Sequence, residues 1–261
     1  MNKNRMPVVF VGHGSPMNAI EDNHWSRGFA RLADEFIKPN AILAISAHWY
    51  LEGTFVTGNT SPGTIHDFAG FPNDLYKIEY PAPGSMEIAD KVVETLELNR
   101  SNITLDWGLD HGTWSVLRWM YPDADIPVIQ LSIDYRLEEK EHLSIAQALQ
   151  DLRNKGVLIL GSGNIVHNLR DAFSQKNAGT EIIPDWAKRF DEAVVKSVES
   201  YQVKELLNLS KSEDGQLSHP TPDHWLPLIY VYGAAEEGES VRFPIAGFDW
   251  GSLSRRTVIF G

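Results

Sequence analysis

The chain has 261 residues, of which 43% are hydrophobic and 22% charged, a composition typical of a globular protein with a full hydrophobic core. The formal net charge of −12 argues against nucleic acid or an anionic membrane as the main partner, because both bind clustered Lys and Arg. The absence of cysteine excludes disulfides, thiol nucleophiles, iron–sulfur clusters and cysteine-ligated zinc. No apolar run approaches the roughly 18 residues of a spanning helix and no apolar signal segment opens the chain, so we expect a cytoplasmic protein.

Short β-branched runs alternate with amphipathic segments along the chain. Buried strands are predicted at residues 8–11, 41–45, 128–133 and 157–160, with shorter ones at 54–56 and 257–260. Helices are predicted at residues 26–37, 85–98, 137–154, 185–198 and 228–235. This alternation predicts one α/β domain over residues 1–261, with a mostly parallel central sheet flanked by helices. The Pro-, Gly- and Asn-rich stretch 58–83 is too long for an ordinary connection and is predicted to be a functional loop.

Three of the nine histidines follow predicted strands. His13 follows strand 8–11, His48 follows strand 41–45, and His167 lies past strand 157–160. Ligands of open α/β sheets bind beyond the carboxyl ends of the strands, so these side chains are expected to meet in one crevice. A single histidine at such a place is more often structural than functional, and the prediction therefore depends on several of them converging.

Two more histidines lie in distinctive short motifs. His111 stands in Asp110-His111-Gly112-Thr113-Trp114, and His224 lies in a loop that enters the apolar helix 228–235. Converging neutral imidazoles without thiols suit Zn(II), Fe(II), Cu(II) or Ni(II), so we predict a metal site at the carboxyl ends of the strands. The run Gly161-Ser162-Gly163-Asn164 lacks the third glycine of a dinucleotide fingerprint and the lysine of a P-loop, so phosphate binding there is rejected.

Three of the remaining histidines are assigned places outside the predicted ligand set. His142 stands in a charged helical segment and is expected to be solvated. His66 in the long loop is a candidate for lining a pocket, and His219 a candidate for flanking the metal loop.

Five short motifs follow one another along the chain: Gly12-His13-Gly14-Ser15-Pro16, Ser46-Ala47-His48-Trp49, Asp110-His111-Gly112-Thr113-Trp114, Gly161-Ser162-Gly163-Asn164 with His167-Asn168, and Asp223-His224. In this order they resemble the class III extradiol ring-cleavage dioxygenases, specifically the 4,5-DOPA dioxygenase extradiol branch of bacteria and plants. The resemblance extends over nearly the whole chain, from His13 to beyond His224.

The resemblance implies a mechanism and a role for each matched residue. His13, His48 and His224 would ligate one divalent metal per chain, His167 would be the acid/base, and His111 a helper or substrate contact. The substrates would be O2 and a small aromatic diol such as DOPA, cleaved to seco-DOPA, which can cyclise to betalamic acid. A proton shuttle near neutral pH suits histidine, although His167 as a fourth metal ligand stays open.

One departure from the family pattern bears on the identity of the metal: protocatechuate-type relatives complete their site with a glutamate where this chain has His224. Replacing a carboxylate with a neutral imidazole moves the site toward a zinc-like histidine set. Zinc has no redox chemistry, so Fe(II) is expected for turnover and Zn(II) as an alternative occupant of the isolated protein.

Other functions share the same side chains. A zinc hydrolase would use His167 or Asp223 as its base, and a non-catalytic metal-binding interaction protein would keep the cleft without consuming O2. A structural metal site is disfavoured because such sites are usually closed and rich in cysteine. Aromatic walls are expected around the diol from residues that adjoin the proposed ligands or the long loop, with the first two favoured: Trp49, Trp225, Phe68, Phe71, Tyr76 and Trp114. No basic cluster in the sequence marks a binding site for a substrate carboxylate.

Overall fold

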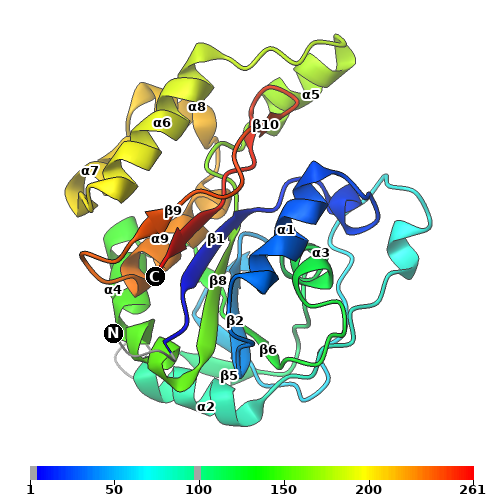
Figure 1. The fold of residues 1–261 in the computed structure, drawn as a ribbon, viewed down its shortest axis with the longest axis vertical. Helices are drawn as coiled ribbons and strands as arrows, with labels where there is room; N and C mark the ends of the chain where they lie inside the picture. Colours follow the sequence, from blue (N-terminus) through cyan, green and yellow to red (C-terminus); the bar gives the residue numbers. More distant parts are fainter. Residues whose placement is uncertain (1–4, 97–100) are drawn as a thin grey trace.

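A computed structural model describes residues 5–96 and 101–261 and contains a six-stranded central sheet (Figure 1). The strand order is β6-β2-β8-β1-β12-β9, in which the first four strands are parallel and β12 and β9 are antiparallel to their neighbours. The bounds are β1 (Val8–Gly12), β2 (Ala41–Ser46), β6 (Val128–Gln130), β8 (Val157–Gly163), β9 (Val241–Arg242) and β12 (Val258–Phe260). The predicted α/β fold with a mostly parallel sheet is confirmed.

Helices cover both faces of this sheet because the central strands are apolar on both sides. Val8 and Phe10 of β1 belong to a core shared with α4, α6 and α9, whereas Val9 and Val11 belong to a second core shared with α1 and α3. The α-helices are α1 (His24–Asp34), α2 (Met86–Thr95), α3 (His111–Met120), α4 (Glu139–Ala148), α5 (Leu169–Asn177), α6 (Asp185–Glu199), α7 (Val203–Leu209), α8 (Glu213–Ser218) and α9 (Leu226–Ala234). The 3₁₀ segments are η1 (Pro16–Ala19), η2 (Leu75–Lys77), η4 (Leu149–Lys155) and η5 (Pro222–His224).

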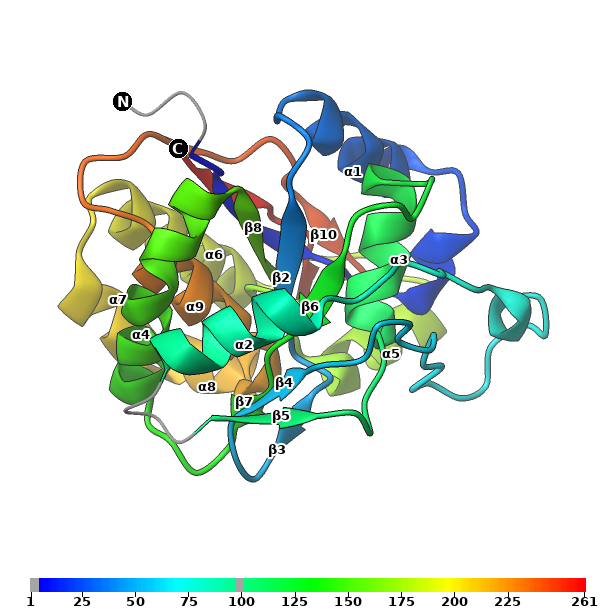
Figure 2. The same ribbon diagram turned by 90° about the horizontal axis from the view of Figure 1, so that it is seen from below.

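Three two-stranded sheets lie outside the central one. They pair β3 (Tyr50–Leu51) with β7 (Ile133–Asp134), β4 (Phe55–Thr57) with β5 (Asn102–Thr104), and β10 (Phe248–Asp249) with β11 (Leu253–Ser254). In Figure 2 the strands of two of these sheets, β3 with β7 and β4 with β5, lie below α2. The prediction of a single strand at 128–133 is therefore wrong, because the segment contains two strands, β6 and β7, in different sheets. The chain leaves the central sheet after Gln130, because the Ser132 side chain donates to Gly53 O, between β3 and β4, and accepts from Phe55 N of β4.

The predicted helices exist, with altered ends. The segment 137–154 is α4 followed by the 3₁₀ turn η4, and the end of the predicted helix 85–98 lies outside the described residues. Helices α5, α7 and α8 were not predicted, because each is short and has only one or two buried residues. Helix α3 was not predicted either, because half of its buried residues are polar or glycine and mask the apolar periodicity. Within residues 5–96 and 101–261, no helix combines the length and apolarity needed to traverse a lipid bilayer.

Candidate active site

The carboxyl ends of three neighbouring parallel strands carry the predicted histidines. His13 follows β1, His48 lies two residues after β2, and the end of β8 supports the segment that carries His224. Gly163 at that end packs against η5 so closely that a Cβ would lie 2.3 Å from the His224 carbonyl oxygen. The Asn164 N–H donates to the same oxygen at 3.0 Å. Glycine is thus required for η5 to reach the strand ends.

The rings of His13, His48 and His224 form a nearly equilateral triangle. Their centroids are 5.0 Å apart for His13 and His48, 5.2 Å for His13 and His224, and 5.1 Å for His48 and His224. The Nε2 atoms of His13 and His48 face each other at 3.1 Å. Two imidazole nitrogens bound to one tetrahedral ion at about 2.0–2.1 Å would be roughly 3.4 Å apart, so this spacing suits a shared cation.

Each of these rings has its Nδ1 atom held by an oxygen. The Ser162 hydroxyl donates to Gly112 O at 2.5 Å, so it accepts from His13 Nδ1, 3.0 Å away. His48 Nδ1 lies 3.1 Å from Asp67 Oδ2, and His224 Nδ1 contacts Asp223 Oδ2. With the proton assigned to Nδ1, each Nε2 keeps a lone pair, which is the arrangement of histidine metal ligands oriented by oxygen acceptors. The donor set therefore fits a metal ion.

Burial keeps the imidazoles in the form that can bind a metal. Desolvation lowers the pKa of His13 and of His48 well below the ordinary histidine value, and the neighbouring imidazoles lower it further. Burial also lowers the pKa of His167, with a further contribution from His224. These rings are consequently neutral at neutral pH, as ligation and proton acceptance both require.

His167 and His111 lie on either side of the triangle. The His167 ring stacks on His224 at a centroid distance of 3.5 Å, and among the described residues its ring nitrogens have no hydrogen-bond partner. His111 lies 3.9 Å from His48 between centroids, and its Nδ1 is 2.9 Å from Asp67 Oδ2. Donor atoms lie within 4.8 Å of one another in two groups, one of His13, His48 and His111 and the other of His167, Asp223 and His224. All five predicted histidines are thus brought together.

A cavity of about 450 Å³ opens onto these five histidines. Its aromatic wall consists of Phe68, Phe71, Phe173 and Trp250. Phe68 and Phe71 come from the long loop, which was the predicted functional segment. Phe173 and Trp250 had no signal in the sequence, because neither adjoins a histidine of the site.

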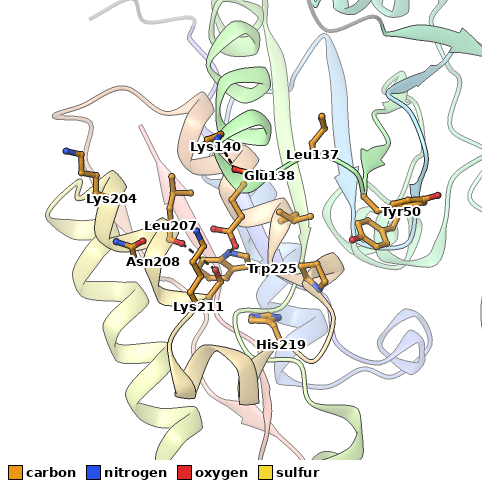
Figure 3. Close-up of a pocket in the computed structure, with 15 residues that line it drawn as sticks. Tyr50, Leu137, Glu138, Lys140, Lys204, Leu207, Asn208, Lys211, His219 and Trp225 are labelled. Carbon is orange, nitrogen blue, oxygen red and sulfur yellow. Dashed lines mark hydrogen bonds and ion pairs between the residues drawn. The ribbon is translucent and has the colours of Figure 1, made fainter.

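The two aromatic residues favoured as walls, Trp49 and Trp225, do not line this cavity. Trp49 is buried and stacks on Trp107 at 5.4 Å, and Trp225 is buried with its Nε1 donating to Glu139 at 3.1 Å. Successive side chains point in different directions, so a residue next to an inward-pointing histidine points away. Trp225 instead lines a separate cavity of about 760 Å³ behind η5, shown in Figure 3.

Two further aromatic candidates also lie outside the cavity. Tyr76 packs on Phe68 at a centroid distance of 5.1 Å, and the buried Trp114 donates to Ile65 O at 2.8 Å.

Three other histidines, His66, His142 and His219, hydrogen-bond within the fold. The prediction that His142 is solvated is wrong: it is fully buried beneath α9, and its Nδ1 lies 3.0 Å from the Tyr230 hydroxyl. His66 Nε2 donates to Ile78 O at 3.0 Å and lies outside the cavity wall. His219 lies behind η5 beside Trp225, where it donates to Ile165 O at 2.7 Å.

Comparison with known proteins gives a consistent answer. The family described as the catalytic LigB subunit of aromatic ring-opening dioxygenase matches residues 7–247. The chain is 45% identical to the 4,5-DOPA dioxygenase extradiol of Escherichia coli K12, covering 100% of this chain and 97% of that protein. It is 38% identical to the 4,5-DOPA dioxygenase extradiol of Beta vulgaris, covering 95% and 93% of the two chains. A crystal structure of an uncharacterised E. coli K12 protein superposes with a TM-score of 0.86 at 40% identity, covering 98% of this chain and 100% of the other.

The fold and the convergent histidines define the class, and the chain belongs to the LigB family of aromatic ring-opening dioxygenases. It is an extradiol ring-opening dioxygenase, similar over its whole length to enzymes named for DOPA. The family uses a non-haem metal, and the histidine cluster is the group of described side chains in this cavity that fits one.

Proposed function

We propose that this protein opens the ring of DOPA or a closely related catechol by 4,5-cleavage, giving seco-DOPA, which can cyclise to betalamic acid. In this proposal residues 1–261 form a single catalytic domain with one divalent metal. The support for the substrate comes from the relatives named for DOPA and from a cavity with aromatic walls beside the histidines.

The proposed metal ligands are His13, His48 and His224. The observation that carries this assignment is that the three ring centroids lie 5.0–5.2 Å apart, with an oxygen near each Nδ1 atom, so that the Nε2 lone pairs are left for a metal. The His111 ring is farther from His13, at 5.6 Å between centroids, and its Nδ1 hydrogen-bonds Asp67 at 2.9 Å. We therefore assign His111 to contact with the substrate.

His167 is the proposed acid/base. It lines the cavity, stacks on a proposed ligand, and is neutral because burial lowers its pKa. A neutral ring with unpartnered nitrogens can accept a diol proton and return it while the ring opens. Fe(II), when bound, would supply the electron transfer to O2 that ring opening needs, which Zn(II) lacks.

Oxygen uptake by metal-loaded protein tests this function. Protein stripped of metal and reloaded anaerobically with Fe(II) should consume O2 on addition of DOPA and form a yellow ring-opened product. The matched control is the same preparation loaded with Zn(II), which should bind catechol without consuming O2. Equal ring cleavage by zinc-only protein, or no O2 uptake with any catechol, would contradict the proposal; hydrolysis by the zinc form would favour a zinc hydrolase.

A further inference from the structure

Helix α5 turns one face toward the cavity instead of the core. Leu169, Phe173 and Lys176 are spaced by four and three residues, so they share one side of the helix, and all three line the cavity. Leu169 and Phe173 are 42% and 48% exposed, whereas Ala172 is the helix residue that is buried. Exposed apolar side chains beside a catalytic cavity indicate a surface for ligand contact rather than for packing.

Lys176 supplies a cation to this wall. Among the described residues that line the cavity, it is the one Lys or Arg, and it forms no ion pair with a described carboxylate. Its Nζ lies 3.9 Å from the centroid of the Trp250 ring, a cation–π contact that orients the ammonium without neutralising its charge. The three N–H donors of Lys176 therefore remain available to an anion.

Trp250 is held in an unusual backbone conformation to make this contact. Its φ is 46°, in the left-handed region that bulky residues rarely adopt, and it begins the turn between β10 and β11. The ring lines the same cavity and packs on Phe173 at 5.8 Å. Backbone strain of this kind persists where the surroundings impose it, often at ligand sites, and here it places the ring under the lysine.

The acidic groups that share a cavity wall with Lys176 hydrogen-bond other residues. Lys176 also borders a neighbouring cavity of about 600 Å³ that includes Asp249 and Glu21. Asp249 accepts from Trp25 Nε1 at 2.9 Å and pairs with the buried Arg255 at 3.1 Å. Glu21 accepts from the Asn23 amide at 3.3 Å. Lys176 thus pairs with no carboxylate of the described residues, and its ammonium is available to an anionic ligand group.

The cavity therefore has a histidine end and a cationic end. His167 precedes α5 and stacks on a proposed metal ligand, whereas Lys176 lies roughly 10 Å farther along the helix axis than Leu169. A lysine side chain on a helix leans back toward the N-terminus, which brings its ammonium toward the histidines. We propose that Lys176 binds the carboxylate of the substrate side chain and so selects catechols with a short carboxylate-bearing arm. This inference rests on the proposed ring-cleavage function.

Paired substrates test the assignment. Fe(II)-loaded wild type, Lys176→Met and Lys176→Arg are compared on 3-(3,4-dihydroxyphenyl)propanoate and on 4-ethylcatechol, which lacks the carboxylate. Lys176→Met should lower kcat/KM for the propanoate by roughly 10-fold, mainly through KM, and change that for 4-ethylcatechol less than about 2-fold. Lys176→Arg should recover most of the preference. The matched control is Lys188→Met, an exposed lysine of α6 that removes the same charge away from the cavity.

Equal losses on both catechols, or none on the propanoate, would overturn the assignment of Lys176. Calorimetric binding of both catechols to zinc-loaded protein under anaerobic conditions separates this outcome from failure of the proposed function. If wild type consumes no O2 with DOPA or with either of these catechols, ring cleavage fails as the function. A propanoate preference in binding that Lys176→Met abolishes would still support the carboxylate site, and the absence of such a preference would overturn it.

Discussion

Asp67 offers the most direct way to perturb the metal site without removing a proposed ligand. Its Oδ2 lies 3.1 Å from His48 Nδ1 and 2.9 Å from His111 Nδ1, and its Oδ1 accepts the His111 N–H at 2.8 Å. Burial alone would raise the pKa of Asp67, but the hydrogen bonds from His111 outweigh it and hold the pKa below the ordinary value. The carboxylate is therefore ionised at neutral pH, accepts from His111 and places its second oxygen beside His48 Nδ1.

Asp67→Asn keeps the shape of this side chain but leaves one acceptor oxygen where the backbone N–H and the ring of His111 each use one. One of these hydrogen bonds is lost, and so is the negative charge beside His48 Nδ1 and the metal site. Metal affinity should fall about 10–100-fold, equivalent to roughly 1.4–2.7 kcal/mol. Competition with a chromogenic zinc chelator at pH 7.5 measures the change. Asp74→Asn is the control, because Asp74 lies in the same loop and is 81% exposed in its side chain. Affinity of Asp67→Asn within 2-fold of wild type would refute this reasoning.

Three further predictions concern single histidines. His13→Ala should abolish metal binding and turnover together, whereas His111→Ala should retain the metal. If metal analysis finds the reverse, His111 is the ligand and His13 is not. His167→Ala should keep stoichiometric metal yet lose roughly 10²–10⁴-fold in kcat, and loss of metal from this variant would make His167 a ligand. Burial lowers the pKa of His142 to about 4, below its unfolded value of 6.5, so the folded state binds fewer protons and stability should decrease as pH falls from about 6.5 to 4. The free energy of unfolding should fall by about 3 kcal/mol over this pH range. Urea unfolding of the metal-free protein should show a shallower pH dependence for His142→Asn than for wild type, and identical slopes would contradict this role of His142.

The fold and the histidine cluster could be predicted because both follow from patterns local in the sequence. Apolar β-branched runs marked the parallel strands, and the geometry of parallel sheets dictates that residues after β1 and β2 meet at one edge. The residues that orient the rings were harder to find. Asp67 lies in a loop far from its partners His48 and His111 in sequence, and no spacing links them.

The residues that line the cavity could not be predicted from the sequence. Trp49 and Trp225 adjoin proposed ligands but point away from them, and both are buried. Lys176 and Trp250 meet only because α5 packs beside the β10–β11 turn (Figure 1). A short helix with one buried residue carries a weak periodic signal, so its cavity-facing side could not be recognised beforehand.

The fate of molecular oxygen tests the central claim most directly. Fe(II)-loaded protein and DOPA are incubated under ¹⁸O2 in unlabelled water, and the product is examined by mass spectrometry. Ring opening by a dioxygenase places one labelled atom in the new carboxylate, where it is retained, and the other in an aldehyde that exchanges with water. A product that carries ¹⁸O in its carboxylate is the predicted result. A product whose carboxylate takes its new oxygen from water would contradict the account.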